Sequence, residues 1–274
     1  MTRTFAARAL PALAALALWP AAALAQLPDT FQLERLRISP DAASLSSVEG
    51  GEVQPDLTWS AGMWTGWSQN PLVAYRLQDG ARAPLVANRV GGSVFGAFGF
   101  RGWAQLSVEL PVVLFQDRQL SSIFPASELS SLSAAGVGTL RVTPKVQLLS
   151  ARDRGVDLAL QAAFGIPLSS GASYTGEPGL AFSPGVAISR TLGDFRLAGG
   201  VGATLRQNTT LLNAEIGPEL EAQAGAGWQP SLPSGQQLPL SVELAVFAGT
   251  SATRPFAQTN ETPVELRGLL TYQP

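Results

Sequence analysis

The sequence predicts an all-β fold, and the clearest observation behind this prediction is an alternating pattern in residues 136–168. From residue 140 to residue 148, apolar side chains occupy the even positions and polar side chains mainly the odd ones. A second arm alternates in a similar way from Val156 onward. Because successive side chains of a strand point to opposite faces, each arm is predicted to be a strand with one apolar and one polar face. The charged link at residues 151–155 can join the two strands as a hairpin.

The same pattern recurs along the chain, which is the second observation. The third is the composition, since the 28 glycines and 20 prolines among 274 residues suit a protein of many strands and turns. Several segments reach the ~9–11 residues that a tilted strand needs to cross a bilayer, against the ~5–6 usual in soluble sheets. The strand candidates are residues 57–75 (interrupted near 70–71), 85–100, 103–116, 136–149, 156–168, 180–190, 194–206, 211–228, 239–250 and 263–272.

The links between these segments predict two different ends. Links after the second, fourth and sixth candidates are tight, as at residues 101–102 and 151–155, whereas several others are longer and polar, as at 116–135. Two links depart from this rule, because 207–210 is short and 229–238 is long. Short turns at one end and long loops at the other are typical of an outer-membrane barrel.

The amino-terminal part is predicted to be a leader followed by an extended segment. Residues 1–25 carry Arg3 and Arg8, then an apolar run, and end in an Ala-x-Ala site, which is the pattern of a secretory signal peptide. The alternative, a membrane anchor, needs ~20 apolar residues, and the run is shorter. Residues 26–56 show no sustained period and are expected as an extended segment on the periplasmic side or tucked into a lumen. Residues 57–274 then form the barrel domain.

The composition excludes several chemistries. The chain has no cysteine and no histidine, so thiolate and imidazole metal sites and Ser-His or Cys-His catalysis are all excluded. A formal net charge of −2 gives no basic footprint for nucleic acid. No cofactor and no enzymatic activity are therefore expected.

The two faces of the strands differ in chemistry. Apolar faces are continuous, as from Leu106 to Leu114, while the opposite faces carry both signs of charge. In a transmembrane barrel the apolar face meets lipid and the interior is polar, whereas a soluble β-sandwich has the reverse arrangement. Within this polar set, Arg141 and Lys145 are expected to point inward opposite Glu109. The residues predicted to line the lumen are Glu109, Arg141, Lys145, Asp157, Arg196, Arg206, Glu215, Glu219, Glu243, Glu265 and Arg267.

Aromatic residues mark the expected membrane boundary. Amphipathic rings suit the headgroup level, and girdles of them are typical of barrels. Trp103 is out of phase with its apolar face. The predicted interface aromatics are Phe98, Phe100, Phe195, Trp228 and Tyr272.

Several short motifs, in this order, resemble the barrel half of outer-membrane proteins of the OmpA-associated, transporter-like family. The resemblance implies an outer-membrane barrel, often followed by a peptidoglycan-binding periplasmic domain, and only the barrel part is expected in this chain. The chain also ends Thr271-Tyr-Gln-Pro274 without a terminal aromatic, so a closing hairpin is expected to be missing. The motifs are Phe31-x-Leu-Glu-Arg-Leu-Arg37 with Leu45–Glu49, Asn70-Pro-Leu-Val73, Glu109-Leu-Pro-Val-Val-Leu114, Gly136-x-Gly-x-Leu-Arg-x-x-Pro-Lys145 and Ile166-Pro-Leu168.

Two further motifs have simpler readings than they first suggest. Residues 199–202, Gly-Gly-Val-Gly, lack the following helix of a dinucleotide site and are expected to be small residues within the barrel wall. The three carboxylates of Glu215, Glu219 and Glu221 are predicted to lie on one strand face. They could bind a cation or simply form a negatively charged stretch of the lumen wall.

The combined prediction is an antiparallel transmembrane β-barrel of about 10–12 strands in the outer membrane, in contact with its lipid. A narrow or plugged pore or transporter for an unidentified small solute is the first expected function. The alternatives are a non-conducting structural or surface-display barrel, which a lumen filled by paired charges would favour, and a soluble periplasmic β-sandwich that binds a ligand. The sequence does not specify the oligomeric state.

Overall fold

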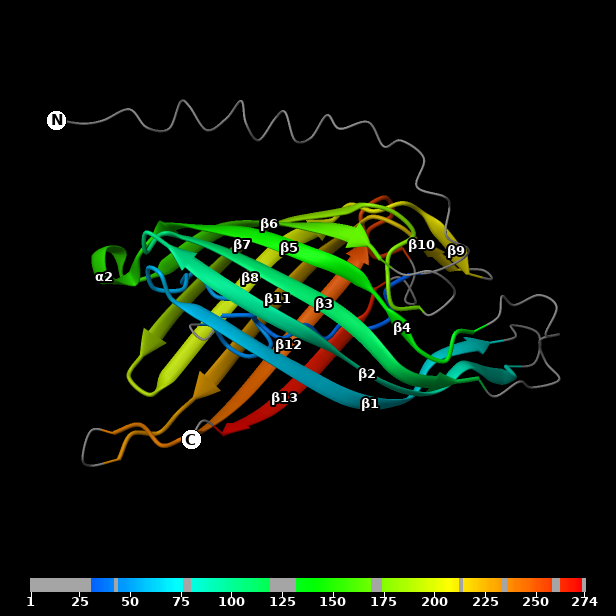
Figure 1. Ribbon diagram of the computed structural model, residues 1–274, viewed down its shortest axis with the longest axis horizontal. Coiled ribbons are helices and arrows are strands. Elements are labelled where there is room, and N and C mark those ends of the chain that lie inside the picture. Colours follow the sequence, from blue (N-terminus) through cyan, green and yellow to red (C-terminus); the bar gives the residue numbers. More distant parts are fainter. Residues whose placement is uncertain are drawn as a thin grey trace, which may run out of the picture.

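The computed structural model describes residues 31–41, 44–75, 80–118, 132–168, 174–211, 214–232, 236–257 and 262–272 (Figure 1). The predicted leader at residues 1–25 lies outside these ranges, as does most of the predicted 116–135 loop. Within the described ranges no helix is both long and apolar enough to cross a membrane.

One antiparallel sheet dominates the structure, and its strands follow one another in chain order. Ten strands form the path β1-β2-β3-β5-β6-β7-β8-β11-β12-β13, with the short β4 paired to β3. Such a meander needs only hairpin connections, which suits alternating strands of this length. The bounds are β1 Trp59–Tyr75, β2 Arg82–Phe100, β3 Ala104–Asp117, β4 Gly136–Val137, β5 Thr139–Leu149, β6 Asp157–Pro167, β7 Ala181–Leu192, β8 Phe195–Thr204, β11 Glu219–Trp228, β12 Leu240–Ser251 and β13 Val264–Tyr272.

The prediction of an all-β, antiparallel barrel-like fold is confirmed. The predicted break near residue 70 is a bulge, because the pairing of β1 with β2 shifts between Gln69 and Leu72 and Asn70 has a φ of 50°. Trp103, which is out of phase, lies in the turn between β2 and β3, where strand alternation does not apply. The candidate at 136–149 is divided at Gly138, which contacts the backbone of Thr175 too closely for a side chain.

The connections fall into two groups, as predicted. At one end, here called the short-turn end, β5 and β6 are joined by the single helical turn α2, Ala151–Arg154, closed by Gly155 in the left-handed conformation. The other end, the long-loop end, carries the link between β8 and β11. This link contains a hairpin of its own, β9 Thr209–Leu211 and β10 Ala214–Ile216. The predicted strand at 211–228 is therefore wrong before Glu219, where β11 begins, and the supposedly short link at 207–210 is part of a long loop.

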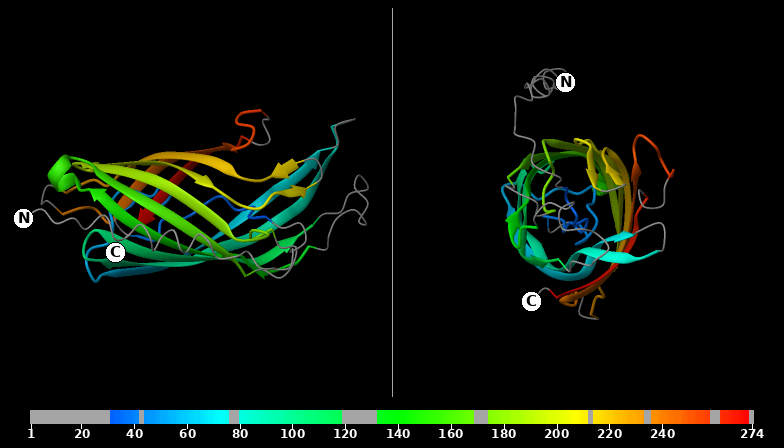
Figure 2. Two further views of the ribbon diagram at one scale, coloured as in Figure 1. Left: turned by 90° about the horizontal axis from the view of Figure 1, so that it is seen from above. Right: turned by 90° about the vertical axis from the view of Figure 1, so that its right-hand side faces the viewer.

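The sheet curls around a lumen as an open barrel (Figure 2). No pairing joins β1 to β13 among the residues that the structure describes, so these two strands are the edges of an incomplete barrel. Side chains on the outer face of both edge strands are strongly exposed, with Met63 at 74% and Leu266 at 75%. Outward side chains on strands with two neighbours are mostly less exposed, as Leu197 of β8 is at 44%.

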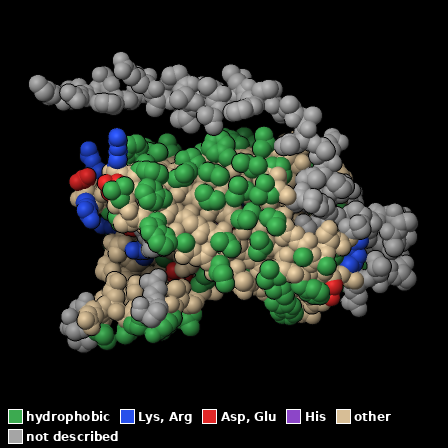
Figure 3. Space-filling model, viewed as in Figure 1, with side chains coloured by type: hydrophobic (Ala, Val, Ile, Leu, Met, Phe, Trp, Pro, Cys, Tyr) green, Lys and Arg blue, Asp and Glu red, His purple; other side chains and the backbone are tan. Residues whose placement is uncertain are grey.

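The outer face is apolar and the inner face is polar. Hydrophobic side chains spread across the outer face, and charged ones gather mainly toward the ends of the molecule (Figure 3). Among the predicted interface aromatics, Phe98 packs edge-on against Phe100. All of them lie near the short-turn ends of their strands, and the exposed ones are Phe100, Phe195, Trp228 and Tyr272.

Candidate functional site

Residues 31–41 and 44–56 run through the inside of the curled sheet, and we call them the luminal segment (Figure 2). The segment starts at the long-loop end, where the backbone N–H of Leu33 donates to the carbonyl oxygen of Tyr174 at 3.1 Å. It ends at the short-turn end, where Gly51 lies so close to the backbone of Asp157 that an added Cβ would be 2.3 Å from its carbonyl oxygen. The prediction that the extended segment is tucked into a lumen agrees with this path.

Small apolar clusters hold the two ends of the luminal segment. Near the long-loop end, Phe31 packs against Val86 and Tyr174. Toward the short-turn end, Leu45 and Val48 pack with small residues of the wall, among them Ala245. Between these clusters the contacts are polar and charged, because the inward positions of the strands carry polar residues.

Lys145 takes part in an almost fully buried ion pair. Its Nζ is 3.0 Å from Asp41 and 4.0 Å from Glu49, and both Lys145 and Asp41 are almost fully buried. Burial alone would raise the pKa of Asp41, but the charge of Lys145 and hydrogen bonds from Ser44, Lys145 and Gln105 outweigh it and lower that pKa. Burial raises the pKa of Glu49, which Lys145 only partly offsets.

The sharpest local prediction is confirmed for one of its two residues. Glu109 and Arg141 are direct cross-strand partners between β3 and β5, with Nε and Oε2 3.9 Å apart. Lys145 also points inward, but its cross-strand partner is Gln105 and its charged partner is Asp41. The sequence could not reveal this partner because Asp41 belongs to the luminal segment, which has no periodic pattern.

A second layer of ion pairs lies closer to the long-loop end. Arg206 contacts Glu177 at 3.1 Å and Glu219 at 2.8 Å, and Arg35 of the luminal segment also pairs with Glu219. Glu177 comes from the loop after β6, so loop, wall and luminal segment meet in one network. Arg35, Arg37, Asp41 and Glu177 were not among the predicted luminal residues, since none lies on a strand.

The remaining predicted residues divide between the inside and the outside. Asp157 accepts from Gln147, Arg196 donates to the carbonyl oxygen of Ser44, and Glu243 accepts from both the N–H and the hydroxyl of Ser46. Glu265 pairs with Arg267, whose guanidinium also donates to the carbonyl oxygen of Arg35.

Glu215 lies elsewhere and does not join this lining. It is on β10 and forms an exposed ion pair with Arg254. Its placement in a continuous strand with Glu219 and Glu221 is wrong, because the chain turns away from the wall into the β9–β10 hairpin. The three carboxylates therefore do not form one site.

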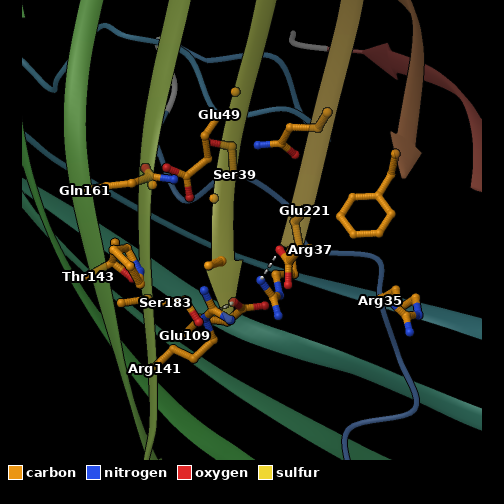
Figure 4. Close-up of a pocket in the computed structure, with 18 of the residues that line it drawn as sticks. Arg35, Arg37, Ser39, Glu49, Glu109, Arg141, Thr143, Gln161, Ser183 and Glu221 are labelled. Atoms are coloured by element: carbon orange, nitrogen blue, oxygen red, sulfur yellow. Dashed lines mark ion pairs between the residues drawn. The ribbon is translucent and has the colours of Figure 1, made fainter. Parts of the chain in front are cut away.

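A cavity of about 110 Å³ lies between the luminal segment and the inner wall (Figure 4). Gly185, Gly200 and Gly202 belong to its lining, and a Cβ at Gly200 would be 2.8 Å from the carbonyl oxygen of Val186. The glycines of residues 199–202 thus let β8 approach β7 and leave this wall without bulky side chains. Facing them, Arg37, Ser39 and Glu49 of the luminal segment reach the cavity.

Comparisons with protein-family models and with curated proteins give no match for this chain. The resemblance to OmpA-associated, transporter-like proteins therefore stays a prediction, and the function has to be argued from the lumen itself.

Proposed function

We propose that this chain is an outer-membrane β-barrel whose lumen is a small-solute pathway, closed in the described conformation by its own luminal segment. The observation that carries the proposal is the passage of residues 31–56 through the curled sheet, held by buried ion pairs. A wall that is apolar outside and polar inside suits lipid on one side and hydrated solutes on the other.

The distribution of exposed side chains supports the membrane location. Val201, Leu244 and Leu266 are 63%, 57% and 75% exposed in the middle of their strands. Large continuous apolar surfaces are uncommon on soluble monomers. The soluble β-sandwich alternative needs apolar side chains between two packed sheets, whereas the inner face of this sheet holds Lys145, Asp157 and Glu243.

The polar character of the luminal contacts supports a pathway that can open. Replacing protein–protein hydrogen bonds by hydrogen bonds to water costs little free energy, whereas exposing a large apolar plug would cost much more. Lys145 holds the central contact, and removing its charge leaves the buried carboxylate of Asp41 and the partly exposed carboxylate of Glu49 without their positive partner.

Conductance in planar bilayers tests this proposal. The folded full chain is expected to give almost no steady current, and Lys145→Met is expected to give resolvable channel openings because it weakens the hold on the luminal segment. Arg152→Gln, in the exposed α2 turn, is the matched control and should behave like the unchanged chain. A steady current from the unchanged chain would contradict closure by residues 31–56.

The second candidate function is a non-conducting structural or surface-display barrel. The filling of the lumen by paired charges favours it, since a structural barrel needs a stable interior more than a passage. It is the better explanation if Lys145→Met, shown to be folded by heat-modifiable gel mobility, also fails to conduct.

A further inference from the structure

We propose that Arg37 and Arg141 form a binding site for a small oxyanion, a carboxylate or a phosphate group, inside the lumen. This site would lie on the proposed solute pathway. It rests on the proposed function in one respect, namely that small solutes reach the lumen. Binding at equilibrium can be measured whether or not the barrel conducts.

The first argument is that both guanidinium groups keep their hydrogen-bond donors unused. Arg37 is 3.8 Å from Glu221 and Arg141 is 3.9 Å from Glu109, beyond the ~2.7–3.2 Å of an N–H···O hydrogen bond. Neither arginine donates a hydrogen bond to any other residue in the described part of the chain. Guanidinium groups bind carboxylate and phosphate oxygens in a bidentate manner, so these donors are suited to an oxyanion.

The nearby carboxylates have other partners. Glu109 accepts from the hydroxyl of Ser93 at 3.0 Å, and Glu221 accepts from the hydroxyl of Thr204 at 2.7 Å. These short bonds hold the carboxylates toward the wall. The arginines of the neighbouring layer differ, because Arg35 and Arg206 each bond Glu219 directly and have fewer free donors.

The two arginines are also close to one another. Both line the same cavity, and Arg141 lies within electrostatic reach of Arg37 (Figure 4). The two positive charges repel each other, Glu109 and Glu221 compensate them from 3.9 and 3.8 Å, and an anion that bonds both guanidinium groups directly would add to this compensation. The inward glycines of β7 and β8 provide the room on the opposite side of the cavity.

Buried polar atoms without a hydrogen-bond partner within the described ranges point to a polar occupant. Such atoms are rare in folded proteins, yet several of them line this one cavity. They include two acceptors, the Oε1 of Gln161 and the Oε2 of Glu177, as well as donors, so an oxyanion that also carries a hydroxyl or ammonium donor, as glycine does, suits the cavity best. They are Arg37 Nε, Ser39 Oγ, Ser47 Oγ, Gln161 Oε1 and Glu177 Oε2.

Titration of the folded full chain in detergent tests the proposal, with acetate, glycine and inorganic phosphate as probes at constant ionic strength. Saturable binding is expected for at least one of them. Arg37→Gln and Arg141→Gln should each weaken it at least about tenfold, since each removes charge-assisted hydrogen bonds. Arg152→Gln should bind like the unchanged chain. Arg37→Lys should recover part of the loss, because it keeps the charge without the bidentate geometry.

The outcomes separate the possible sources of the oxyanion. Binding of acetate and glycine without phosphate assigns the site to carboxylates. Binding of phosphate without acetate and glycine assigns it to phosphate groups. Binding of both kinds of probe shows that the site accepts either oxyanion. Absence of saturable binding by the unchanged chain would overturn the site and mean that the cavity holds water only. If Arg37→Gln and Arg141→Gln, both shown to be folded by heat-modifiable mobility, bound the probe as tightly as the unchanged chain, the assignment to these arginines would be overturned. Either result leaves the conductance test untouched.

Discussion

Single residues decide how firmly the lumen is closed, and Asp41 and Lys145 are the most important pair. Both side chains are almost completely buried, with 0% and 1% exposure. Removing one member of a buried pair leaves an uncompensated charge and typically costs ~3–5 kcal/mol, whereas removing both can be nearly neutral. The pair therefore fixes the position of the luminal segment more than it adds net stability.

Ser47→Cys provides a clean reporter of this contact, because the chain has no cysteine and Ser47 is 3% exposed. In that background Asp41→Asn and Lys145→Met should each raise the rate of labelling by a soluble maleimide on the order of a hundredfold, as ~3 kcal/mol implies. The double variant should be labelled more slowly than either single variant.

The exposed pair Arg254–Glu215 supplies the control. Its side chains are 49% and 47% exposed, and such surface pairs contribute ~0–1 kcal/mol. Arg254→Gln should leave the labelling rate of Ser47→Cys unchanged. If the increase in labelling rate of the double variant equalled the two single increases multiplied together, the buried pair would not be the contact that holds the segment.

At the scale of elements, the luminal segment and the wall fit together through close backbone contacts. Gly51 lies against β6, its N–H donates to the hydroxyl of Ser189 on β7, and Gly50 also contacts Ser189. Such contacts need residues without a side chain, because backbone atoms of a paired strand cannot move aside at low cost.

Gly51→Ala should therefore displace the short-turn end of the luminal segment, since its Cβ would lie 2.3 Å from the carbonyl oxygen of Asp157. The expected result is faster labelling of Ser47→Cys with an unchanged heat-modifiable shift of the barrel. Gly268→Ala on β13 is the control, because its Cβ meets no atom within 4 Å. Equal labelling of the two variants would show that this contact does not seat the segment.

At the scale of the whole molecule, the apolar outer face should be matched to lipid. Val201→Arg, in the middle of β8, is expected to lower the free energy of unfolding in lipid vesicles by ~2–4 kcal/mol, because a charge near the bilayer midplane destabilises the folded barrel by about this amount. Thr253→Arg, an exposed loop position, should change it much less. Urea titration in vesicles measures both. A protein that stays folded in solution without detergent, with equal effects of both substitutions, would contradict the membrane location.

The sequence by itself determined the strands and their faces. Period-two alternation placed both ends of β6 to within one residue and the end of β5 at Leu149, but it started β5 three residues early, at 136 instead of Thr139. It also placed Glu109 and Arg141 on the polar faces of two neighbouring strands, because both residues fall on the polar set of alternating positions. The aperiodic residues 31–56 carried no such signal.

Only the tertiary structure decided where that segment lies and what it touches. Asp41 meets Lys145, and Arg35 meets Glu219, across separations of more than a hundred residues that no local pattern encodes. The hairpin that carries Glu215 out of the wall was hidden for a related reason, since three-residue strands are too short to show a period. Alternation reports which face of a strand is polar, whereas the partner of each polar group depends on how the sheet curls and what it encloses.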